Sequence, residues 1–155
     1  MTKYAEGTSV ATDRTLVEIK RVLTRYGASK VGLMEDERGL TVGFEMEDRR
    51  FRMTVLLPDK SQFSRRHINQ HTSVQRTYKE IDNAWDQACR ERYRALFLAI
   101  KAKMVAVESG IETLENAFLA YLCLPSGETM SEFYEDQIEK AYLTGRMPPL
   151  LGSGS

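Results

Sequence analysis

The sequence predicts a single α+β domain in which a small antiparallel sheet is covered by helices. Apolar residues recur with a helical period near the start of the chain, alternate with polar residues between positions 30 and 57, and recover the helical period from about position 78. With 155 residues, 42% of them hydrophobic, the chain can bury one core without disulfides or metal. The predicted order is an N-terminal helix, a three-stranded meander, a long loop, a long helix and two shorter helices.

The N-terminal helix is predicted from the stretch TDRTLVEIKRVLTRYG. Its residues Leu16, Ile19, Leu23 and Tyr26 follow one another at spacings of three, four and three, which places them on one helical face. Gly27 follows at once, and glycine commonly ends a helix. We therefore expect this helix to end beside Gly27 with its apolar face on the core.

Three strands of an antiparallel meander are predicted next. Apolar and polar residues alternate over residues 40–46 and again over residues 51–57, which is the period of a strand with one buried face. Residues 30–34 supply a shorter first strand, and the polar stretches EDERG and EDR have the length of hairpin turns. One face of this sheet should be apolar and should pack on the helices.

Residues 59–77 follow neither period. Pro58 ends the third strand, and the segment after it includes both histidines of the chain, His67 and His71. Structureless segments of such length are uncommon in compact domains, and those that occur are usually functional or mobile. We therefore predict a mobile basic loop here.

Two of the three C-terminal helices are predicted directly after the loop. The long helix covers residues 78–108, and its apolar stripe runs from Ile81 and Trp85 to Met104 and Val107. Residues 112–124 read as a second helix. The residues that it should pack on the core are Leu114, Phe118, Tyr121 and Leu122.

The last helix is predicted between two signals. Thr129 and Glu132 stand at capping-box spacing at its start, and Gly145 should end it. The residues that we expect it to bury are Phe133, Ile138 and Tyr142.

Residues 1–151 are predicted to form one domain. The final GSGS, residues 152–155, has the composition of an added flexible linker and is left outside the fold. The N-terminus has no apolar signal region, and no window approaches 18 consecutive apolar residues. We expect a cytoplasmic protein that makes no contact with a membrane.

No pattern predicts a catalytic centre, a cofactor or a metal site. His67 and His71 have the H-x-x-x-H spacing of a zinc helix, but no third ligand is near them in sequence. Ser126 lacks the G-x-S-x-G elbow, and no phosphate-binding glycine motif is present. Cys89 and Cys123 lie in apolar contexts that are typical of small buried thiols. We therefore expect a protein that is not an enzyme and that needs no cofactor.

Charge is distributed unevenly, although 22 basic and 22 acidic residues cancel. Residues 60–80 hold five cations against Glu80 alone, whereas residues 108–140 hold eight acids against one lysine. The molecule should be basic beside the sheet and its loop, and acidic at the C-terminal helices. Any attraction to a charged partner must therefore be local.

The basic side of the molecule predicts contact with nucleic acid. If Phe51 and Met53 face the core, Arg50 and Arg52 point outward from the sheet. Arginines on an exposed sheet face, beside a basic loop with one aromatic ring, suit phosphate contact combined with base stacking by Phe63. The candidate binding residues are Arg50, Arg52, Lys60, Phe63, Arg65, Arg66, Arg76 and Lys79.

Other interpretations remain open. Arg50 and Arg52 can instead pair with Glu45 and Glu47 across the hairpin. The acidic C-terminal helices or the long helix can serve a module that docks on a host protein, and the broad stripe of the long helix can also support a homodimer. A further hypothesis is an enzyme or small-nucleotide binder whose loop closes on its ligand.

A resemblance is carried by five stretches: KYAEGTSV, EIKRVLTRYGAS, LLPDK, RERYRALFLAIKAKMVAVESGIETLENAFLAYLCLPSGETM and GRMPPLL. They are similar to a group of small, uncharacterised proteins encoded in phage and prophage genomes. The resemblance runs from about residue 3 to residue 151, is weakest over residues 61–77 and includes no catalytic motif. It implies a phage-related accessory protein in a host cell and no particular activity.

The leading hypothesis from the sequence is a non-enzymatic phage protein that binds nucleic acid, single-stranded rather than duplex. A meander followed by a long helix is also the core order of single-strand-annealing recombinases. This analogy is one of topology alone, and it adds slightly to the nucleic-acid hypothesis.

Overall fold

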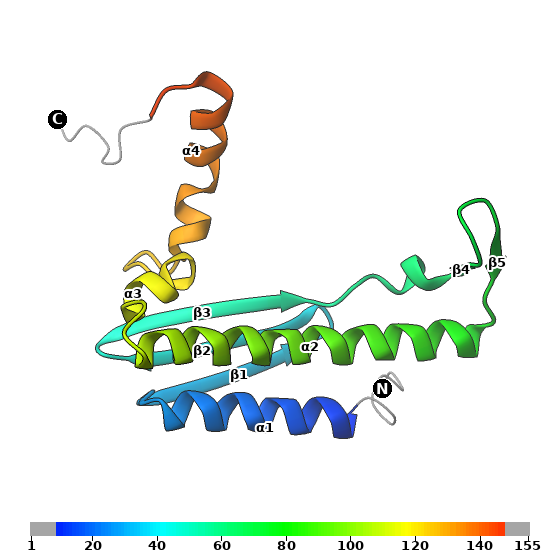
Figure 1. Ribbon diagram of the computed structural model, residues 1–155, viewed down its shortest axis with the longest axis horizontal. Helices are drawn as coiled ribbons and strands as arrows, with labels where there is room; N and C mark the ends of the chain where they lie inside the picture. The colour runs from blue at the N-terminus through cyan, green and yellow to red at the C-terminus, as the bar shows by residue number, and fades with distance from the viewer. Residues whose placement is uncertain (1–8, 148–155) are drawn as a thin grey trace.

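The computed structural model describes residues 9–147 and has the predicted α+β architecture (Figure 1). Helix α1 (Ser9–Arg25) leads into the strands β1 (Lys30–Asp36), β2 (Gly39–Met46) and β3 (Arg49–Leu56). These strands form one antiparallel sheet in the order β1-β2-β3, so the predicted meander is confirmed.

Two tight turns set the register of the meander. Between β2 and β3, Glu47 and Asp48 both have positive φ, at 51° and 57°, as the two central residues of a two-residue hairpin turn require. The resulting register places Phe44 opposite Phe51 and Glu45 opposite Arg50. Side chains therefore alternate as predicted between a buried inner face and an open outer face.

The core lies between the inner face of the sheet and the two helices that cover it, α1 and α2 (Tyr78–Glu108). Phe44, Phe51 and Phe118 form an aromatic cluster with ring centroids 5.0 to 5.6 Å apart. The other large side chains that are almost fully buried are Ile19, Leu23, Leu40, Tyr93, Ile100 and Met104. Burial also raises the pKa of the Cys89 thiol to about 11.

Helix α2 is much longer than the sheet that it covers. Its 31 residues span about 46 Å, against about 27 Å for a strand of eight residues. A capping box between Thr77 and Glu80 fixes its first turn. The N-terminal part of α2 therefore extends past the end of the sheet (Figure 1), where Trp85 donates a hydrogen bond to the Pro58 carbonyl at 2.8 Å.

The segment predicted as an unstructured loop contains short elements. A 3-10 turn, η1 (Lys60–Phe63), is capped by Asp59, and the strands β4 (Arg65–His67) and β5 (Ser73–Gln75) pair as an antiparallel hairpin. Strands of three residues are too short to show an alternating pattern in the sequence. The hairpin therefore could not be recognised from periodicity.

The second C-terminal helix is shorter than predicted. Only α3 (Leu114–Ala117) and the 3-10 turn η2 (Leu119–Tyr121) are helical, and Leu122 then forms a β-bridge with Phe51. The edge of β3 offers free backbone groups at this point, and the Cys123 N–H donates to the Arg50 carbonyl at 2.8 Å. Pairing with β3 therefore replaces the last turns of the expected helix.

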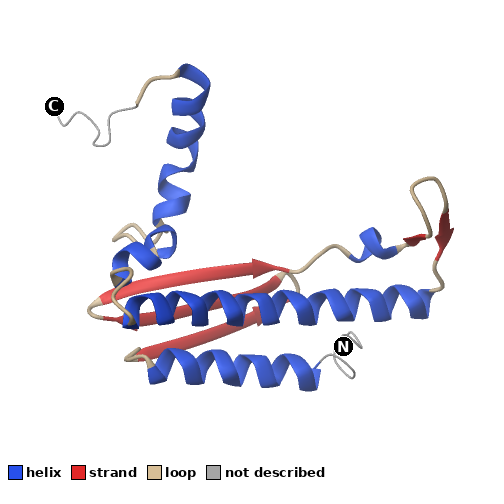
Figure 2. Ribbon diagram, viewed as in Figure 1, coloured by secondary structure: helices blue, strands red, loops and turns tan. Residues whose placement is uncertain are grey.

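The last helix, α4 (Met130–Thr144), begins and ends as predicted but does not bury its apolar face. Its start has the Thr129–Glu132 capping box, and Gly145 after it is left-handed at φ 66°. The expected burial of Phe133, Ile138 and Tyr142 is wrong, because these side chains are 41%, 54% and 88% exposed. The reason is that α4 projects away from the sheet and from α1 (Figure 2).

Candidate nucleic-acid interface

The basic segment of the sequence forms a projecting hairpin at the N-terminal end of α2. Strands β4 and β5 pair Arg65 with Gln75 and Arg66 with Val74, and the Ile68 N–H donates to the Thr72 carbonyl across the loop at 2.8 Å. The residues of both strands lie at the surface, and Figure 1 shows the hairpin extending from the body of the molecule. The predicted basic loop is thus a two-stranded ribbon.

The cations of this hairpin region are not neutralised by carboxylates, with one exception. Arg65 donates to the Ser73 hydroxyl at 2.8 Å, and Arg76 donates to the Phe63 carbonyl at 3.2 Å, so both guanidinium groups have neutral partners. The side chains of Arg66 and Lys79 form no hydrogen bond or ion pair with another residue of the described chain. The exception is Lys60, which pairs with Asp82 of α2.

The acidic C-terminal helix is too distant to neutralise these cations. Helix α4 rises from one end of the molecule, and the β4–β5 hairpin lies at the other end (Figure 1). The charge separation predicted from the sequence is therefore a separation in space. We call Arg65, Arg66, Arg76 and Lys79 the hairpin cations.

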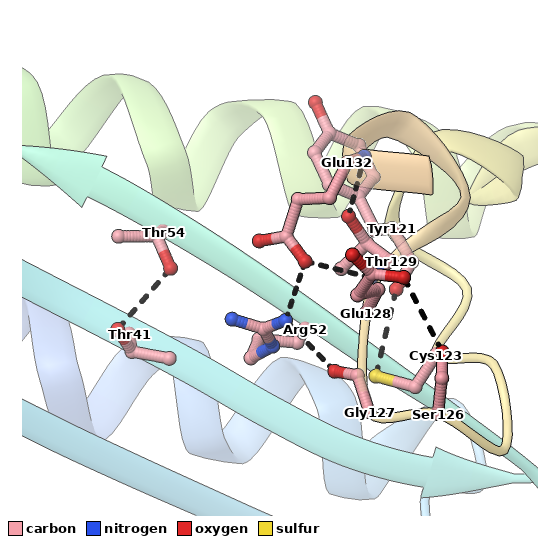
Figure 3. A network of polar contacts seen from close by, with 10 residues as sticks. All are labelled: Thr41, Arg52, Thr54, Tyr121, Cys123, Ser126, Gly127, Glu128, Thr129 and Glu132. Carbon is pink, nitrogen blue, oxygen red and sulfur yellow. Dashed lines mark hydrogen bonds and ion pairs between the residues drawn. The ribbon is translucent and has the colours of Figure 1, made fainter. Parts of the chain in front are cut away.

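The two arginines predicted on the outer face of the sheet belong to a separate, internally paired site. The Arg50 Nε lies 3.1 Å from Glu45 Oε1, which is the cross-strand pair considered as an alternative. The Arg52 guanidinium lies 2.8 Å from Glu132 of α4 and donates to the Gly127 carbonyl at 3.1 Å (Figure 3). Neither guanidinium is brought beside the hairpin cations.

A shallow hollow of about 350 Å³ lies on this outer face. Gly32 and Gly43 are opposite one another in the register and leave its floor without side chains. Lys30 also lines the hollow and pairs with Glu45 at 2.9 Å, so that Glu45 is shared between two cations. The hydrogen bond from Lys30 is the main cause of a lowered pKa for the Glu45 carboxyl.

Glu132 connects α4 to the sheet. The backbone N–H of Thr129 donates to its carboxylate at 2.8 Å and, with Arg52, lowers the pKa of Glu132 below its usual value. A carboxyl group whose pKa is lower in the folded protein than in the unfolded chain stabilises the folded state at pH values above its unfolded pKa. This contribution is lost as the pH falls through the folded pKa.

We expect Glu132→Gln to lower the free energy of unfolding at pH 7 by less than about 1 kcal/mol, because the carboxylate is half exposed. The difference from the unsubstituted protein should shrink as the pH falls below the folded pKa, since both side chains are then neutral. Urea unfolding followed by circular dichroism at several pH values measures it. Glu139→Gln, which removes an α4 carboxylate without a partner among residues 9–147, is the control. An equal loss at all pH values would contradict a role for the charge.

The aromatic side chains near the hairpin differ in accessibility. Phe63, the predicted stacking residue, is half-buried. Tyr78, the first residue of α2, is 90% exposed and stands between two of the hairpin cations in sequence, Arg76 and Lys79. The sequence shows that Tyr78 is close to these cations, but its exposure follows from α2 extending past the sheet.

The histidines lie on the same hairpin. His67 is the last residue of β4 and His71 is in the loop, and both side chains are exposed. No cluster of three or more histidine, cysteine or acidic side chains is placed to hold a metal within residues 9–147. No helix of that part of the chain has the length and apolar character needed to cross a membrane.

Comparison with known proteins gives no assignment. No family model matches the sequence, and neither a curated protein nor a solved structure matches it. The resemblance to phage-encoded proteins therefore stays a prediction, and the function has to be argued from the geometry.

Proposed function

We propose that this protein is a non-enzymatic, phage-related accessory protein that binds nucleic acid through its β4–β5 hairpin. The observation that supports it is the set of four hairpin cations, which project at one end of the molecule and bond to no carboxylate among the described residues. Guanidinium and ammonium groups without an internal counterion are the groups that bind phosphate and release its condensed counterions.

Single strands are the preferred form of nucleic acid in this proposal. Tyr78 offers one side chain for stacking beside the cations, and every base of an unpaired strand has a face that can stack on it. A duplex keeps its bases stacked inside and can use only the phosphate contacts at this site. The exposed ring therefore favours the single strand.

The proposal is tested by fluorescence anisotropy with labelled single-stranded and double-stranded oligonucleotides over a salt series. We expect the logarithm of the association constant to fall with the logarithm of salt concentration, with a slope of about −2 to −3 for three or four phosphate contacts on a single strand. Absence of binding at low ionic strength, or binding without salt dependence, would contradict the proposal.

Tyr78→Ala is expected to weaken binding to a single strand about tenfold, because stacking of one base contributes about 1–3 kcal/mol. Affinity for duplex should stay unchanged. Tyr78→Phe, which keeps the ring, is the matched control and should bind as the unsubstituted protein does. The measurement is the same anisotropy titration at one low salt concentration. Equal losses for the two variants, or a loss on duplex as well, would show that the ring does not stack.

A second candidate function is docking on a host protein, and the exposed apolar side of α4 is the observation that favours it. It would use the acidic C-terminal end of the molecule rather than the hairpin. A pull-down from host lysate that recovers one stoichiometric protein, unaffected by nuclease, would support this alternative.

A further inference from the structure

The chain has two histidines, and both lie on the β4–β5 hairpin. His67 is the last residue of β4 and pairs with Ser73 of β5, and His71 lies in the loop that joins the two strands. Both side chains are exposed, and neither imidazole forms a hydrogen bond or ion pair with another residue of the described chain. Both imidazole rings are therefore available to a ligand of the hairpin.

The charge of an exposed imidazole depends on pH. Histidine is the side chain that takes up a proton between about pH 8 and about pH 5, and its protonated form is a cation with two N–H donors. Protonated His67 and His71 would add two positive charges to the four hairpin cations, at the projecting end of the molecule (Figure 1).

The charged neighbours of His67 on the hairpin are cations. Arg65 is two positions before it, on the same side of β4, and donates at 2.8 Å to the hydroxyl of Ser73, the residue opposite His67. Arg66 lies on the other side of the strand. The loop around His71, residues 68–72, has no other charged residue. A phosphate beside this strand attracts the guanidinium and imidazolium groups together.

No carboxylate of the hairpin region is free to neutralise a protonated imidazole. Residues 60–79 include no acid. The three acids that flank them each have another partner in the described chain: Asp59 accepts from the Ser61 N–H, Glu80 accepts from the Thr77 N–H, and Asp82 pairs with Lys60. The counterion of a protonated histidine must therefore come from solvent or from a bound ligand.

We propose that His67 and His71, once protonated, bind phosphate beside the hairpin cations, so that the protein binds nucleic acid more tightly as the pH falls from about 8 to about 5.5. This inference rests on the proposed function, because it concerns the same hairpin. Binding and protonation are linked reciprocally: a proton that strengthens binding to the strand is itself held more tightly in the complex.

The experiment is an anisotropy titration of the full chain with a labelled oligothymidylate at about pH 8 and about pH 5.5, each over a salt series. Thymine is chosen because its ring takes up no proton in this range. Affinity at low salt should be about tenfold higher at the lower pH, and the slope of the salt dependence should be steeper by about 1.4, for two additional phosphate contacts.

Two double variants separate the imidazoles from other groups that take up protons. His67→Gln with His71→Gln should lose the rise in affinity at low pH, because glutamine takes up no proton, and it keeps the backbone pair with Ser73. It also keeps the N-terminal amino group and every carboxylate, so it measures their share. His67→Arg with His71→Arg should bind at the higher pH about as tightly as the unsubstituted protein does at the lower pH, since arginine stays charged throughout.

A matched control returns a histidine to the glutamine variant at another place. Thr24 is exposed in the last turn of α1, at the opposite end of the molecule from the hairpin (Figure 1). Thr24→His in the glutamine variant should not restore the pH dependence. Restoration would show that the charge of the whole surface is sensed, and it would overturn the inference.

The outcomes distinguish this inference from the function on which it rests. Salt-sensitive binding that is equal at the two pH values, or a pH dependence that the glutamine variant retains in full, would overturn the inference and leave the proposed function standing. Absence of salt-sensitive binding at both pH values would overturn both.

Discussion

Removal of all four hairpin cations is expected to weaken binding to a single-stranded oligonucleotide by at least about a hundredfold at low salt, and to abolish most of the salt dependence. The variant carries Arg65→Ala, Arg66→Ala, Arg76→Ala and Lys79→Ala. The reason is that each cation that contacts a phosphate releases a counterion, and the described chain offers these four groups no carboxylate in its place. Anisotropy titrations at several salt concentrations measure both quantities.

A variant with only two substitutions tests the cations without disturbing the hairpin. The side chains of Arg65 and Arg76 bond to Ser73 and Phe63, so their removal can disturb the ribbon, whereas the side chains of Arg66 and Lys79 have no partner within residues 9–147. Arg66→Ala with Lys79→Ala should therefore reduce the slope of the salt dependence by about 1.4 while leaving the fold intact.

A matched control removes the same charge elsewhere. Lys20→Ala with Arg21→Ala, both exposed on α1, should leave affinity and slope nearly unchanged. If this control weakens binding as much as the Arg66 and Lys79 variant does, the attraction is a property of the whole surface. The hairpin would then not be the binding site.

The sequence predicted the sheet well because its signals are local. Alternation over β2 and β3 identified the buried face, and the hairpin lengths indicated the antiparallel strand order. The pairing of Arg50 with Glu45 was an alternative that the sequence left open. The Thr129–Glu132 cap was also recognised from spacing alone. Each of these features depends on residues that are close together in the chain.

The sequence could not predict contacts that depend on distant parts of the chain. Arg52 bonds to Glu132, which is 80 positions away, and the pairing of Leu122 with Phe51 replaces part of a predicted helix. The pattern of α4 correctly showed an apolar face at Phe133 and Ile138. It could not show whether another part of the same chain covers that face.

The candidate site was predicted in composition but not in shape. The hairpin cations were identified from the local excess of positive charge, which the sequence displays directly. Their arrangement on a ribbon depends on three-residue strands that have no pattern of their own. The exposure of Tyr78 depends on how far α2 extends past the sheet, which follows from the packed structure.

Gly39→Ala is expected to destabilise the fold by about 3 kcal/mol or more, which corresponds to a decrease in Tm of about 6–12 °C. Gly39 begins β2 at φ +157°, and a Cβ atom there would lie 1.9 Å from the Val55 carbonyl oxygen. This contact is with the backbone of the paired strand, so no change of side-chain conformation can relieve it. The β2–β3 pairing must shift, and the buried residues of both strands shift with it.

Gly43→Ala is the matched control, since Gly43 lies in the same strand. A Cβ atom there would lie 3.9 Å from the Phe51 carbonyl oxygen, an ordinary contact, and alanine restricts the unfolded chain more than glycine does. Its free energy of unfolding should therefore equal or slightly exceed that of the unsubstituted protein in urea titrations followed by circular dichroism. If Gly39→Ala were as stable as Gly43→Ala, β2 and β3 could not approach as closely at Gly39 as described. The register that pairs Gly39 with Leu56 and Glu45 with Arg50 would then be wrong.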